Sequence, residues 1–176
     1  MEKALRIILP LVILGLAYLV YDSIDRPIRE QKKINHIEGK IINRIRQIKT
    51  AQFAYHDLKN SFAPNFDTLI NAMNNEKWPI IKVVGDPEDT LSVVTYDTTY
   101  ISLYEYAFPN KDANLDSLPF VPLNPNGAKF LMQADIITIN NTQVPVFMVK
   151  DPEPYNEKRA LTLGDMNQPV YSGNWE

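Results

Sequence analysis

The feature that most constrains this chain is an apolar run near its N-terminus, from Ile7 to Tyr21, which contains no charged residue. Extended back to Ala4, the run reaches the roughly 18–20 residues that a helix needs to cross about 30 Å of hydrocarbon. A cleavable signal peptide ends in small residues, whereas the segment from Ala17 to Asp22 is mostly bulky. The sequence therefore predicts an uncleaved transmembrane signal anchor over residues 1–24, which makes the protein an integral membrane protein.

A long basic amphipathic helix is predicted over residues 25–62. A short break and restart are expected at Asp25–Pro27, because proline is well placed at the first position of a helix. Apolar residues then recur every seven positions, at Ile34, Ile41, Ile48, Tyr55 and Phe62. Ile37, Ile45, Ala51 and Leu58 fill the positions between them and complete one apolar stripe.

Two interpretations of this stripe are open. A coiled coil would use it for self-association, but its intermediate positions drift and include charged residues. We favour the second interpretation, in which Ile45 to Phe62 packs on the protein's own sheet. The first half of the helix would then contact a partner, such as a second copy or another envelope protein, or the membrane surface. Its candidate interaction face is formed by Ile34, Ile37 and Ile41.

Charge is divided unevenly along the chain. Residues 26–50 hold eight basic and two acidic residues, whereas residues 51–176 hold eight basic and sixteen acidic ones. Basic residues close to a membrane are attracted to anionic lipid, so the candidate lipid contacts are Arg26, Arg29, Lys32 and Lys33. A solvated helix face is the alternative. Lys3 and Arg6 favour a cytoplasmic N-terminus, but the four basic residues on the other side of the apolar run outnumber them, so a simple count under the positive-inside rule favours a cytoplasmic C-terminal domain.

Residues 63–176 are predicted to form a small α+β domain with an antiparallel sheet and an irregular C-terminal tail. Asn65 is placed to cap a short helix from Phe66 to Asn74. Extended segments are expected at residues 78–84, 91–96, 98–104 and 159–163, with a turn at 85–89 and a long loop at 111–126. Residues 129–139 and 144–149 are predicted to form a hairpin across Asn140–Gln143, with Pro145 at an edge or at the start of its strand.

Few residues suggest reaction chemistry. The chain has no cysteine, and His36 and His56 are too far apart on one helix to share a metal. No nucleophile, zinc or phosphate-loop motif occurs, and the basic segment has no aromatic platforms for nucleic acid. We therefore expect no enzyme, no nucleic-acid partner and no cofactor. A weak calcium site is the one exception, either at Asp112–Asp116 or among Asp86, Glu88 and Asp89.

The segment from Ile48 to Leu69 combines an alanine-containing helix end, Tyr55, a polar turn, Phe62, Pro64 and an acid shortly before a leucine. Together with the apolar N-terminus, residues 1–73 resemble the type IV pilins and type II secretion pseudopilins. The resemblance implies a pilin-like fold with an extracytoplasmic domain. The pilin processing motif is absent, because Gly15 lies inside the apolar run and the acid nearby is Glu2.

The whole chain, which ends in Ser172-Gly173-Asn174-Trp175-Glu176, also resembles single-pass membrane proteins of Bacteroidota, and this resemblance implies lineage and topology. We expect an inner-membrane location with a periplasmic domain. These features together lead to the expectation of a non-enzymatic, membrane-anchored structural or assembly component of a bacterial envelope machine, such as a pilus-like, secretion or motility apparatus. The alternative is an envelope ligand- or peptide-binding module that uses the loop from Asp112 to Asn126.

Overall fold

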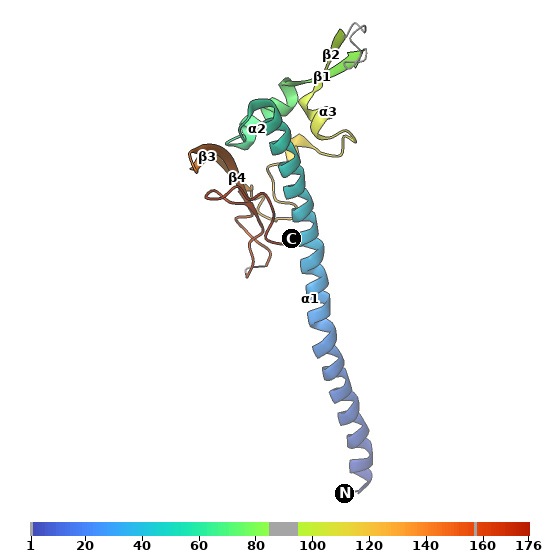
Figure 1. The fold of residues 1–176 in the computed structure, drawn as a ribbon. Helices are drawn as coiled ribbons and strands as arrows, with labels where there is room; N and C mark the ends of the chain where they lie inside the picture. Colours follow the sequence, from blue (N-terminus) through green and yellow to red (C-terminus); the bar gives the residue numbers. More distant parts are fainter. Residues whose placement is uncertain (1, 85–94, 157) are drawn as a thin grey trace. The chain divides into compact units, whose positions relative to one another are not determined.

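Figure 1 shows the computed structural model, which describes residues 2–84, 95–156 and 158–176. The chain divides into two compact units, residues 1–39 and residues 40–176. Helix and antiparallel strands are both present, so the fold class is α+β with a long apolar N-terminal helix. The predicted turn at 85–89, the first part of the strand expected at 91–96 and the candidate calcium ligands Asp86, Glu88 and Asp89 lie outside the described residues.

Helix α1 (Glu2–Lys59) is continuous, and it contains Pro10 and Pro27 in its interior. The predicted break at Asp25–Pro27 is therefore wrong. A proline in the helix interior destabilises the helix by about 3 kcal/mol. An ion pair between residues four positions apart stabilises it by only about 0.2–0.5 kcal/mol. Two such pairs flank Pro27, Arg26 with Asp22 at 2.7 Å and Arg29 with Asp25 at 3.0 Å. The long runs of helix-forming residues on both sides thus outweigh the local penalty.

The C-terminal half of α1 packs into the 40–176 unit, as the stripe predicts. Ile45, Ile48 and Ala51 are fully buried. The helix ends at Lys59 because Asn60 turns to a φ of 56°, a conformation that asparagine tolerates at helix ends. Packing on the protein's own domain, rather than a coiled coil, therefore accounts for this half of the stripe.

One sheet has the order β3-β4-β5, formed by β3 (Leu131–Ile139), β4 (Thr142–Lys150) and β5 (Thr162–Gly164), all antiparallel. The predicted hairpin is confirmed, with a loop of two residues, Asn140 and Asn141, instead of four. Their φ angles of 50° and 63° fit a type I′ turn. Pro145 lies beyond the stretch of β4 that pairs with β5, and its carbonyl accepts the Tyr171 hydroxyl at 2.6 Å.

Helix α2 (Phe66–Asn75) begins as predicted, because the Asn65 side chain accepts the Thr68 N–H. Strands β1 (Lys77–Val84) and β2 (Thr95–Ser102) form a separate two-stranded antiparallel sheet (Figure 1). The expected strand at 98–104 stops at Ser102, since this side chain caps helix α3 (Leu103–Ala107) by accepting the Glu105 N–H. A 3-10 turn, η1 (Leu115–Ser117), lies inside the predicted loop.

Four aromatic rings hold α1 against the three-stranded sheet. Phe62 lies 4.5 Å from Phe147 of β4, measured between ring centroids, and Phe53 of α1 lies 5.4 Å from Tyr171 of the tail. Phe147 is fully buried. Aromatic pairs at these spacings add about 0.5–1.5 kcal/mol each beyond simple burial. The core of the 40–176 unit therefore lies between the last turns of α1 and strand β4.

Candidate functional site

The N-terminal part of α1 presents apolar side chains that nothing in the described chain covers. From Ile8 to Tyr21 its large apolar residues are 49–68% exposed. This helix is long and apolar enough to cross a membrane. A monomer in water rarely exposes so much contiguous apolar surface, which makes this segment the candidate membrane-binding site.

The candidate lipid contacts Arg26, Arg29, Lys32 and Lys33 are all exposed, but they are not equivalent. Arg26 and Arg29 form ion pairs with Asp22 and Asp25. No ion pair in the described part of the chain involves Lys32 or Lys33. The positive charge available to an anionic lipid headgroup is therefore carried mainly by the two lysines.

The predicted interaction face needs one correction. Ile41 is only 2% exposed, because it belongs to the buried stripe of the 40–176 unit. Ile34 and Ile37 are partly exposed. The candidate interaction face on this stretch of α1 is therefore reduced to Ile34 and Ile37.

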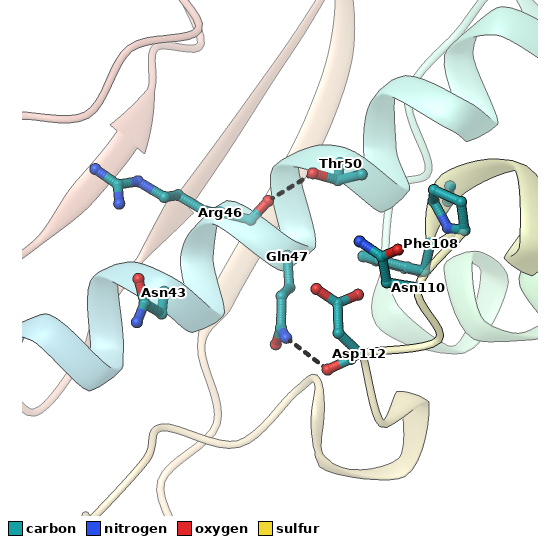
Figure 2. Close-up of a pocket in the computed structure, with 9 residues that line it drawn as sticks. Asn43, Arg46, Gln47, Thr50, Phe108, Asn110 and Asp112 are labelled. Atoms are coloured by element: carbon teal, nitrogen blue, oxygen red, sulfur yellow. Dashed lines mark hydrogen bonds between the residues drawn. The ribbon is translucent and has the colours of Figure 1, made fainter.

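A polar pocket lies between α1 and the segment that follows α3 (Figure 2). Its volume is about 420 Å³, and α1 contributes Asn43, Arg46, Gln47 and Thr50 while the opposite wall is formed by residues 107–110 and 112. Gln47 Nε2 donates to the Asp112 carbonyl at 3.2 Å and so ties the two walls together. Figure 2 shows the Asn110 and Asp112 side chains directed toward α1, whereas the Arg46 guanidinium points away from them.

The pocket's lining includes several side chains that can form hydrogen bonds to a ligand. Amides both donate and accept hydrogen bonds, and a carboxylate accepts them, so Asn43, Gln47, Asn110 and Asp112 match a polar uncharged ligand. Sequence reasoning identified Asp112 through its loop but missed Asn43 and Gln47. Their spacing of four residues on the polar side of α1 was the available signal.

The candidate calcium segment has another structural role. Asn114 Oδ1 accepts the N–H groups of Asp116 at 3.0 Å and Ser117 at 3.4 Å, so its oxygen caps η1. No cluster of three or more metal-ligating side chains occurs among the residues that the structure describes. His56 lies against the ring of Phe62, with centroids 4.8 Å apart.

Comparisons with protein-family models, with curated proteins and with solved structures found no match to this chain. The resemblance to pilins and pseudopilins therefore stays a prediction from the sequence.

Proposed function

We propose that this protein is a non-enzymatic structural or assembly component of a bacterial envelope machine, anchored by residues 1–24. The observation that supports the proposal most is the exposed apolar surface of α1 from Ile8 to Tyr21. Burial of apolar surface yields about 25 cal/mol per Å², so a segment of this size favours a lipid environment strongly. Partners would then be met by the exposed face of Ile34 and Ile37 on α1 and by the 40–176 unit.

The finer proposal is a pilin-like subunit or accessory protein with its domain on the periplasmic side of the inner membrane. It rests on the resemblance carried by residues 1–73. The helix end at Lys59, the buried Phe62 and the capped start of α2 agree with the pattern that carries that resemblance.

Topology tests this proposal first. A C-terminal alkaline phosphatase fusion should be active, and a matched fluorescent-protein fusion dark, if the 40–176 unit lies outside the cytoplasm. The untagged protein should remain in the membrane pellet after extraction with alkaline carbonate. A soluble protein, or a bright cytoplasmic fluorophore, contradicts the anchor or the orientation respectively.

Assembly is tested by cysteine crosslinking, which is clean because the chain has no native cysteine. Single cysteines at Ile34 and Ile37 should crosslink to a second copy or to another envelope protein. Cysteine at the exposed Arg46, on a different side of α1, is the matched control. Labelling of Ile34 and Ile37 by lipid probes alone would remove the support for assembly through this stretch.

The polar pocket favours a second candidate function, a ligand-binding module. An uncharged polar ligand such as an envelope glycan fragment should raise the melting temperature of the full-length protein. Asn43→Ala together with Asp112→Ala should abolish the rise, and Asn74→Ala, an exposed residue outside this pocket, should not. A glycan screen that leaves the melting temperature unchanged contradicts this candidate.

A further inference from the structure

The β1–β2 hairpin exposes an apolar face. Pairing places Pro79, Ile81 and Val83 of β1 on the same face as Tyr100, Thr98 and Tyr96 of β2. Ile81 is 61% exposed, Val83 46%, Tyr96 69% and Tyr100 63%. A two-stranded hairpin is marginal in water, and three or more strands are usually needed for stability. These strands therefore have the chemistry of a sheet that is completed by another molecule.

The base of the hairpin is held firmly by the rest of the 40–176 unit. The Trp78 ring stacks on Tyr106 with centroids 4.2 Å apart, and the Tyr106 hydroxyl donates to Asp57 of α1 at 2.9 Å. The Leu103 N–H donates to the Glu76 carbonyl at 2.9 Å and closes the ladder. The exposed strands are thus a positioned element, which lowers the entropic cost of docking.

Among the described residues, no strand pairs with the outer edge of β2. The Leu103–Glu76 bond continues the β1–β2 register, and bonded and non-bonded pairs alternate along an antiparallel ladder. Counted from that bond, Tyr96, Thr98 and Tyr100 direct their N–H and C=O groups away from β1. No third strand pairs with this sheet among the described residues. The β1 edge is less suitable, because Pro79 lacks an N–H there.

We propose that the partner on this edge is β2 of a second copy of the chain, paired antiparallel about a twofold axis through Thr98. The proposal deepens the assembly function above and rests on it. In this register Tyr96 of each copy lies opposite Tyr100 of the other, with both apolar faces on the same side, and such aromatic pairs stabilise a sheet. Asp97 lies opposite Thr99, so the two carboxylates are not directly opposed. The result is a four-stranded sheet.

The contact area of this dimer is small, so the dimer depends on membrane anchoring. A tyrosine side chain offers about 150–250 Å², so the exposed parts of the two tyrosines amount to roughly 200–300 Å² per copy. A standard interface buries about 800 Å² per partner. The dimer is therefore weak in dilute solution and depends on the high effective concentration of two copies held in one membrane.

The test uses single cysteines in the full-length protein reconstituted in lipid vesicles. Directly opposed residues in bonded pairs have Cα atoms about 5.5 Å apart, which a disulfide spans. Thr98→Cys should therefore give at least tenfold more disulfide-linked dimer on mild oxidation than Thr99→Cys. Crosslinking at Thr99 instead, or at neither position, overturns the proposed pairing.

Charged substitutions at the two tyrosines distinguish loss of the dimer from a folding defect, because one combination should abolish the crosslink and the other should restore it. Adding Tyr96→Asp and Tyr100→Asp to Thr98→Cys opposes like charges across the axis, so the crosslink should fall at least tenfold. Tyr96→Asp with Tyr100→Lys opposes unlike charges and should restore it. Loss of the crosslink in both variants, or labelling of position 98 by lipid probes only, contradicts the dimer.

Failure of the hairpin dimer and failure of the assembly function give different results. Crosslinks to protein from Ile34 and Ile37 without any from Thr98 overturn the hairpin and leave assembly intact. A chain that does not partition into membranes overturns the assembly function itself.

Discussion

At the scale of single residues, the most consequential side chain is an amide in the apolar stripe. Gln52 is fully buried, and its Nε2 donates to the Ala63 carbonyl at 2.9 Å while its Oε1 accepts the Ala63 N–H at 2.8 Å. Ala63 is buried too, so its backbone groups need this partner. Gln52 thereby fixes the path of the chain between α1 and α2.

Gln52→Leu keeps the volume but leaves both Ala63 groups without that partner. Each buried unsatisfied group costs about 1–3 kcal/mol, so we expect the free energy of unfolding to fall by about 2–4 kcal/mol in chemical denaturation. Gln47→Leu is the matched control, because it removes one hydrogen bond at the rim of the pocket. Equal losses in the two variants would argue against a special role for Gln52.

Asp151 makes stability depend on pH. Burial raises the pKa of its carboxyl, although the Glu153 N–H that it accepts at 3.0 Å acts in the opposite direction. Between the unfolded and the raised folded pKa, the folded state binds more protons, so stability falls as pH rises through that window. Asp151→Asn retains the acceptor oxygen and removes the charge. It should be more stable than the parent at neutral pH.

The advantage of Asp151→Asn should shrink as the pH is lowered below the folded pKa, because the parent carboxyl then becomes neutral as well. Thermal unfolding measured across the acid range checks this. Asp116→Asn, which changes an exposed carboxylate, is the control and should follow the parent curve. An advantage that does not vary with pH would show that the carboxyl's charge is not the cause.

At the scale of elements, the β3–β4 hairpin depends on two left-handed residues. Asn141 has a φ of 63°, which glycine adopts freely and β-branched residues strongly resist. Asn141→Gly should leave stability unchanged or raise it by up to about 1 kcal/mol. Asn141→Val should lower it by about 1–2 kcal/mol. Denaturation midpoints measure both, and a tolerated valine would contradict the turn geometry.

The elements also show where sequence patterns succeed. Helix α2 was predicted with its Asn65 cap, and the β3–β4 hairpin was predicted with a turn at Asn140, though two residues longer than the observed one, because both depend on residues within a few positions of each other. The restart at Pro27 was predicted from the same kind of local signal and is wrong. There the preference of one proline competed with long helix-forming segments on either side, and the segments prevailed.

At the scale of the whole molecule, the charges next to the proposed membrane anchor should determine the protein's preference for anionic lipid. Each lysine near an anionic surface contributes about 1 kcal/mol, which corresponds to roughly fivefold. Lys32→Gln with Lys33→Gln should therefore strongly reduce labelling by a photoactivatable anionic lipid in vesicles. Arg26→Gln with Arg29→Gln should reduce it less, since Asp22 and Asp25 already pair with these arginines.

High salt separates this effect from a change in insertion. At about 1 M ionic strength the screening length falls to roughly 3 Å, so the difference between the two pairs of variants should vanish. A difference that persists in salt, or an equal reduction by both pairs, would contradict the proposed role of the lysines.

By itself, the sequence determined the apolar N-terminal helix, the stripe along the second half of α1, the cap of α2 and the β3–β4 hairpin. These features follow from helical or strand periodicity and from turn chemistry, which operate over a few residues. The tertiary structure alone decided that Ile41 joins the core, that Gln52 holds Ala63, that Asn43 and Gln47 line one pocket with Asp112, and that no described strand pairs with the outer edge of β2. Each of these depends on which distant segments pack together, and packing among distant segments is not encoded in any local pattern.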